Sequence, residues 1–257
     1  MANSIRFDTA EPGIGLLTIQ RPHVRNALDW EAMHTFAEAI EKAHASPGLR
    51  VLILTGDERA FCAGGDLVEL HEYPSRQDGE RLARLMGEAL NRLDALPIPT
   101  MAAIEGAAIG GGAEIAIACD LRIAAADARI GWAHIRLGIC PAWGGSARLL
   151  EAVGYARALE WQLTGRTLSG EEAYQLGLVD HRADPGEALK TALQLAAEIA
   201  AHDRAAVTAI KRILRTARER SLSEAARLER RLFPLLWAAT AHLEVSQRFM
   251  QAKGKSK

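Results

Sequence analysis

Three consecutive glycines with a glutamate close behind them form the stretch of this sequence best suited to chemistry. They stand between two apolar segments, residues 100–104 and 115–119, and Glu114 directly precedes the second. The first segment predicts a buried strand and the second a fully buried helix. The glycines, residues 110–112, therefore fall where a strand turns into a helix. There the backbone can approach a ligand closely and offer unpaired N–H groups to a phosphate, a carboxylate or a developing oxyanion.

The glycine triplet does not identify a ligand by itself. It fits neither the G-x-G-x-x-G pattern of dinucleotide sites nor the G-x-x-x-x-G-K-[ST] pattern of phosphate loops. A tight, crowded turn explains three glycines as well as a binding site does. Neighbouring elements and further motifs must therefore decide between these two interpretations.

Strands and helices alternate in the part of the chain that leads to this turn. Residues 15–19 and 51–56 predict buried strands, and Asp29 can cap a helix between them. A second small-residue turn, residues 61–67, follows the second of these strands. The apolar spacing over residues 82–96 predicts a further helix. Both small-residue turns are therefore expected to follow strands.

Helices dominate the rest of the chain. A strand is predicted over residues 121–125 and a loop over residues 132–146. Three amphipathic helices are expected beyond them: residues 187–201, 205–218 and 221–237. The predicted fold is α/β with a helical C-terminal extension. We assign residues 1–190 to the core that carries the site and residues 191–257 to the C-terminal helical region.

Composition excludes several classes of protein. The 257 residues are 49% apolar and 25% charged, with a formal net charge of −1, as is usual for a globular protein. This balance gives no electrostatic reason to expect a nucleic-acid or membrane partner. Three widely spaced cysteines, an odd number, favour a reducing compartment over a disulfide framework, and no Cys/His pair has zinc-ligand spacing. The N-terminus lacks the apolar region of a signal peptide. We expect a cytoplasmic protein.

Four segments in the same order resemble the crotonase superfamily, which contains the enoyl-CoA hydratases and isomerases. They are residues 21–28, 54–67, 106–114 and 163–180, and together they span most of the chain. The resemblance implies a spiral of ββα units with trailing helices that assemble as a homotrimer or a dimer of trimers. It also implies an acyl-CoA thioester as substrate and no metal or redox cofactor, because coenzyme A is part of the substrate.

The resemblance also assigns roles to individual residues. In this family two backbone N–H groups polarise the thioester carbonyl and stabilise the enolate that follows. The matching positions here are Gly65 and Gly111. Losing one such donor typically costs about 3–4 kcal/mol of transition-state stabilisation. Glu114 matches the first of the two glutamates with which hydratases hold and activate water.

His134 stands where hydratases carry their second catalytic glutamate. Histidine can also exchange protons near neutral pH, but a Glu/His pair does not simply reproduce a Glu/Glu pair. With the Pro-Ala-Trp-Gly-Gly run at residues 141–145, His134 resembles the ethylmalonyl-CoA decarboxylase branch of the superfamily. Loss of CO₂ from a malonyl-type thioester, such as ethylmalonyl- or methylmalonyl-CoA, leaves the same enolate. Hydration of a 2-enoyl-CoA is our first expectation and decarboxylation the second.

Seven further residues are expected to bind the substrate: Val24, Arg25, Ala63, Asp66, Trp132, Pro141 and Trp143. Val24 and Arg25 match the segment that holds the nucleotide part of CoA in the family. Trp132 and Trp143 are candidates to line the acyl pocket, and core packing explains them equally well.

A protein of another class, a crotonase fold that binds acyl-CoA or RNA without turnover, is the rival hypothesis. Basic residues between positions 211 and 220 lie partly on one predicted helix and would form the RNA face. The net charge of −1 and the absence of interleaved aromatic residues argue against it. We therefore expect no nucleic-acid partner.

Overall fold

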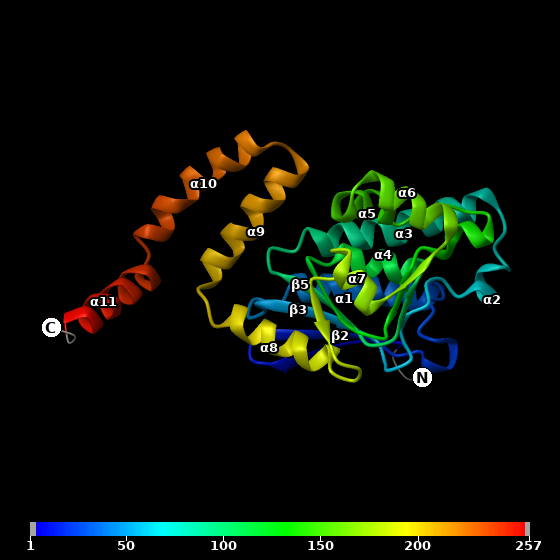
Figure 1. Ribbon diagram of the computed structural model, residues 1–257, viewed down its shortest axis with the longest axis horizontal. Coiled ribbons are helices and arrows are strands. Elements are labelled where there is room, and N and C mark those ends of the chain that lie inside the picture. Colours follow the sequence, from blue (N-terminus) through cyan, green and yellow to red (C-terminus); the bar gives the residue numbers. More distant parts are fainter. Residues whose placement is uncertain (1–3, 255–257) are drawn as a thin grey trace. The chain divides into compact units, whose positions relative to one another are not determined.

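A computed structural model describes residues 4–254 of the chain (Figure 1). Two compact units divide between Ala197 and Glu198, within helix α8 (Ala188–Ala200), and each is described by itself. The first unit contains two sheets and the helices that cover them. The second is helical.

The larger sheet of the first unit has six strands in the order β1-β2-β3-β5-β7-β10. The first two strands pair antiparallel, and every other neighbouring pair is parallel. The central strands β3 and β5 are buried along their whole length, which explains their uninterrupted apolar sequences. The strands are β1 (Ile5–Glu11), β2 (Ile14–Ile19), β3 (Val51–Thr55), β5 (Thr100–Ile104), β7 (Leu121–Ala125) and β10 (His181–Ala183).

The smaller sheet has four strands in the order β4-β6-β8-β9, each three residues long. Its strands are β4 (Ala60–Cys62), β6 (Ala107–Ile109), β8 (Arg129–Gly131) and β9 (Thr167–Ser169). From β3 to β8, successive strands alternate between the two sheets, and a helix follows the pairs β3–β4 and β5–β6. This arrangement is the ββα spiral expected from the resemblance. The sequence did not predict the smaller sheet, because three residues are too few to show a period.

The helices of the first unit begin where the sequence provides a cap. Asp29 accepts from Ala32 N, and Ser169 forms a capping box with Glu172. All eight residues of α4 are buried, as its apolar sequence predicted. The helices are α1 (Trp30–His44), α2 (Leu67–Leu70), α3 (Arg76–Asp94), α4 (Gly111–Ala118), α5 (Gly145–Val153), α6 (Tyr155–Thr164) and α7 (Gly170–Gln175), with 3-10 helices η1 (Pro22–Val24) and η2 (Ala133–Leu137).

Helices α9 (Arg204–Glu219), α10 (Leu222–Trp237) and α11 (Thr240–Gly254) make up the rest of the second unit. Asp203 and Ser221 cap the first two, which pack against each other. Helices were predicted at both positions, whereas α11 was not, because its apolar residues are not gathered on one face. Within residues 4–254, no helix combines the length and the apolar character needed to cross a membrane.

Candidate active site

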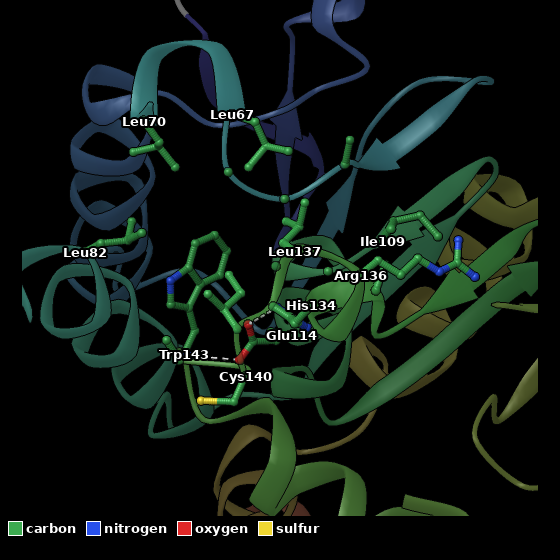
Figure 2. A pocket seen from close by; sticks show the side chains of 18 residues that line it. Leu67, Leu70, Leu82, Ile109, Glu114, His134, Arg136, Leu137, Cys140 and Trp143 are labelled. Atoms are coloured by element: carbon green, nitrogen blue, oxygen red, sulfur yellow. Dashed lines mark hydrogen bonds and ion pairs between the residues drawn. The ribbon is translucent and has the colours of Figure 1, made fainter. Parts of the chain in front are cut away.

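Six of the predicted catalytic and substrate-binding residues line one cavity of about 300 Å³ in the first unit (Figure 2). They are Ala63, Gly65, Gly111, Glu114, His134 and Trp143. Most of the other lining side chains are aliphatic, including Leu67, Leu70 and Leu82. The cavity is therefore mainly apolar, and its polar side chains are the Glu114–His134 pair and Arg136.

The two glycine turns meet at this cavity because strands β4 and β6 pair in parallel. Cys62 at the end of β4 is in register with Ala108 of β6, so both turns leave the same end of the small sheet. Gly64 has φ +93°, and a Cβ atom placed on it would lie 2.9 Å from Gly111 N. Such close contact between two main chains requires glycine at position 64.

Each turn leaves one N–H group without a partner. A parallel bridge joins Leu28 to Gly65 through Gly64 O and Asp66 N, and it does not use the N–H of Gly65. Gly111 is the first residue of α4, where N–H groups have no intrahelical acceptor. Within residues 4–254, neither N–H donates a hydrogen bond. Two unpaired main-chain donors at one apolar cavity are suited to an oxygen that gains negative charge.

The carboxylate of Glu114 is 1% exposed and accepts three hydrogen bonds. Its Oε1 atom accepts from the N–H of Trp143 at 2.8 Å and from that of Gly145 at 2.9 Å. Its Oε2 atom lies 3.0 Å from His134 Nε2 (Figure 2). These partners offset the cost of burying a carboxylate and fix its orientation. The loop after η2 thus holds the glutamate that α4 supplies.

His134 lies on η2 and turns Nε2 toward the carboxylate, so this nitrogen carries the hydrogen when Glu114 is ionised. Its Nδ1 atom is buried and has no partner among the residues that the structure describes. His134 therefore presents one ring nitrogen to the carboxylate and keeps the other buried.

A group of charged side chains that was not predicted holds the Gly65 turn. Arg21 Nη1 donates to Ala27 O and, at 3.2 Å, to Asp66 Oδ2, and Arg21 Nη2 pairs with Asp29. The side chains of Arg21 and Asp66 are only about a tenth exposed. Since Asp66 N also donates to Leu28 O, the segment from Arg21 to Asp29 positions the turn.

Asn26 joins the Arg21 segment to the start of strand β4 from inside the protein. It is fully buried with φ +58°, and its Nδ2 atom donates to Ala60 O at 2.7 Å and to Asp57 at 3.0 Å. Arg21 N donates to Asn26 Oδ1 at 2.7 Å. The sequence contained a signal for this role, because the segment containing both residues carried the family resemblance.

Five predicted substrate-binding residues do not line the cavity. Asp66 caps α2 and pairs with Arg21, and Trp132 is 1% exposed, packed in the core. Arg25 is exposed, and its carbonyl accepts from Ala63 N, so it touches the turn through the main chain. The other two residues, Val24 and Pro141, are half-buried.

Cys62 ends strand β4 beside the turn, and burial raises the pKa of its thiol to about 12. A protonated thiol is a poor nucleophile, so Cys62 contributes packing. In the part of the chain that the structure describes, no three His, Cys, Asp or Glu side chains form a group that could hold a metal ion.

Known proteins resemble this chain over nearly its whole length. Residues 9–255 match the sequence model of the family described as enoyl-CoA hydratase/isomerase. The 2,3-dehydroadipyl-CoA hydratase of Escherichia coli K12 is 36% identical, over 93% of this chain and 92% of that protein. The ethylmalonyl-CoA decarboxylase of Danio rerio is 34% identical, over 91% of this chain and 79% of that protein. A crystal structure of enoyl-CoA hydratase from Bacillus anthracis superposes with a TM-score of 0.92 at 30% identity. The match covers 97% of this chain and 96% of that one. The chain belongs to the enoyl-CoA hydratase/isomerase family of the crotonase superfamily.

Proposed function

We propose that this enzyme acts as a lyase on an acyl-CoA thioester through an enolate that is stabilised by the N–H groups of Gly65 and Gly111. The observation that carries the proposal is the position of these two unpaired donors on the same cavity as the Glu114–His134 pair. A thioester carbonyl at the donors would place its α- and β-carbons toward Glu114. Fixed donors in an apolar cavity stabilise a developing charge more strongly than water does.

Hydration of a 2-enoyl-CoA is the first reaction that we propose. Glu114 takes a proton from water while the oxygen of that water bonds to the β-carbon and the thioester becomes an enolate. The protonated Glu114 then gives the proton to the α-carbon, so that the elements of one water molecule are added. His134 Nε2 donates to Glu114 Oε2 and keeps the carboxylate aligned during both transfers.

Decarboxylation of a malonyl-type CoA is the second candidate, and the histidine at position 134 favours it. This reaction needs no water held between two glutamates. The C–C bond to the carboxylate breaks, CO₂ leaves, and its electron pair forms the enolate. A proton from Glu114 or His134 then completes the α-carbon. The Danio rerio relative, which carries the name of such an enzyme, also supports this candidate.

A substrate panel separates the two reactions. The purified protein is incubated with crotonyl-CoA, ethylmalonyl-CoA and methylmalonyl-CoA, and the products are identified by mass spectrometry together with CO₂ release. We expect water addition to crotonyl-CoA, and CO₂ release without water addition would establish the second candidate instead. Glu114→Gln is the matched control for background hydrolysis. No turnover of any of the three, together with tight acyl-CoA or RNA binding, would favour the non-catalytic alternative.

The remaining expectations complete this proposal. Val24 and Arg25 hold the nucleotide part of CoA, so Arg25→Ala raises KM for the acyl-CoA more than it changes kcat.

Residues 191–257 assemble the chain into a trimer or a dimer of trimers, which light scattering of the full chain measures. The reaction needs no metal or redox cofactor, so dialysis against a chelator leaves the rate unchanged. The expectation of a cytoplasmic location is drawn from the sequence alone.

A further inference from the structure

We propose that the indole of Trp143 limits the length of the acyl group, so that the cavity accepts short acyl chains and excludes medium-length ones. This inference depends on the proposed function, because it concerns the acyl group bound at that same cavity. It gives Trp143 a specificity role that is separate from proton transfer.

The indole lies directly against the first residue of α4. A Cβ atom placed on Gly111 would lie 2.2 Å from Trp143 Cζ3 and 2.4 Å from Cη2. Trp143 is 4% exposed, although its ring lines the cavity, so little of it can move without displacing neighbours. In Figure 2 the indole extends from beside Glu114 toward Leu67 and Leu70.

Hydrogen bonds at both its N–H and its carbonyl fix the main chain of Trp143. Its N–H donates to Glu114 Oε1 at 2.8 Å, and its carbonyl accepts from Arg148 Nη1 at 3.0 Å. Arg148 Nη2 in turn donates to Asn91 on α3 at 2.8 Å. Since the residue that orients the carboxylate also carries the indole, the ring keeps a constant position relative to the reacting carbons.

The path of an acyl chain through this cavity leads to the indole. The carbonyl must lie at the N–H groups of Gly65 and Gly111, and the β-carbon must lie within reach of Glu114. The wall behind Glu114 is closed, because a Cβ atom on Gly145 would lie only 2.4 Å from Glu114 Cγ. A chain that continues past the β-carbon therefore meets the ring of Trp143.

The size of the cavity supports the same conclusion. Its volume of about 300 Å³ is at the lower limit for small-molecule pockets, which span about 300–1,000 Å³. Arg136 also lines it, but its guanidinium donates to Gly165 O at 2.7 Å and points away from Glu114 in Figure 2. Its apolar stem is the part that faces the cavity.

Chain-length profiles of four proteins test the inference: wild type, Trp143→Ala, Trp143→Phe and the matched control Trp132→Phe. For each protein, kcat/KM is measured with crotonyl-CoA and with 2-octenoyl-CoA. We expect Trp143→Ala to raise the octenoyl-to-crotonyl ratio about tenfold or more, because each methylene that gains a place in an apolar pocket is worth about tenfold or more. Trp143→Phe should raise it less, and Trp132→Phe should leave it unchanged, since Trp132 is buried outside the cavity.

Binding measurements keep this inference separable from the proposed function. Calorimetry compares the affinities for butyryl-CoA and octanoyl-CoA, and so measures the same length limit without turnover. If no substrate is turned over but Trp143→Ala selectively gains affinity for octanoyl-CoA, the length limit stands and the proposed function fails. An unchanged ratio in both folded Trp143 variants, or an equal change in Trp132→Phe, overturns the inference. Should Trp143→Ala fail to fold, Trp143→Phe decides.

Discussion

The turn at residues 63–66 and the turn at residues 110–112 leave neighbouring strands and end at one cavity, but different forces hold them. Packing fixes the second turn, because α4 is buried along its whole length and the Trp143 indole covers Gly111. Ion pairs fix the first turn, through Arg21, which is 45 residues from Asp66 in the chain. The first turn is followed by the four-residue helix α2, whose Leu70 covers Gly65.

This difference predicts where each turn is vulnerable. The packed turn should tolerate no added atom, because its neighbour is a buried ring that the main chain holds on both sides. The turn held by ion pairs should tolerate a small added group at Gly65 but not the loss of its charged partner. Four predictions test these statements, in order of decreasing effect.

Replacing the glycine of each turn by alanine gives the largest expected contrast. Gly111→Ala places a Cβ atom 2.2 Å from the Trp143 ring, which must displace either the ring or the N–H group, so kcat should fall about 10³-fold or more. The added Cβ atom of Gly65→Ala would approach Leu70 Cδ1 to 2.6 Å and Met33 Cε to an ordinary 3.8 Å. Since Leu70 is half-buried and this atom is the far end of a side chain that can rotate, kcat should fall only about tenfold. Steady-state kinetics of both variants measure the contrast, and equal losses would refute it.

Glu114→Gln should reduce kcat about 10²- to 10³-fold and lower the free energy of unfolding by only about 1–2 kcal/mol, because the new amide NH₂ group faces His134 Nε2. The amide oxygen can still accept from the N–H groups of Trp143 and Gly145, so the loop stays in place while the proton acceptor is lost. Thermal unfolding and kcat are measured on the same preparation. A large drop in melting temperature with retained kcat would show that Glu114 acts only as a structural anchor.

Arg21→Ala should lower the free energy of unfolding by about 3 kcal/mol and kcat/KM about tenfold, because it leaves Asp29 and Asp66 without their cation. Arg21→Lys, which retains the charge but not the forked geometry, should recover part of both losses. Urea unfolding and kinetics at low urea measure the two effects. If Arg21→Ala matched wild type in both, the ion pairs would not hold the Gly65 turn.

The smallest effect concerns Cys62, which immediately precedes the first turn. Because burial raises the pKa of Cys62 to about 12 from 9.0, its thiol stays protonated in the folded protein at pH 9. Above pH 9 the thiol ionises more readily in the unfolded chain than in the folded one. The contribution of Cys62 to the free energy of unfolding is therefore retained below pH 9 and lost as the pH rises from 9 toward 12. Iodoacetamide at pH 8 should label exposed Cys140 and spare Cys62, as mass spectrometry would show. Labelling of Cys62 in the folded protein would contradict this.

Local patterns in the sequence predicted the elements that position the site. Asp29 caps a helix as expected, and the buried strands at residues 51–55 and 100–104 lie where uninterrupted apolar runs predicted them. The two glycine turns follow strands, as predicted, and both line the cavity. Strands β4 and β6, which immediately precede the turns, were missed because each has only three residues.

The sequence by itself determined the family, the order of the main elements, and the residue types at the two turns, because capping, periodicity and glycine are local signals. Only the tertiary structure decided which tryptophan lines the cavity. Trp132 and Trp143 are equivalent candidates in the sequence, yet one packs in the core and the other lies against Gly111. It also decided the role of Arg21 and the pairing of Glu114 with His134, since both depend on contacts between residues far apart in the chain.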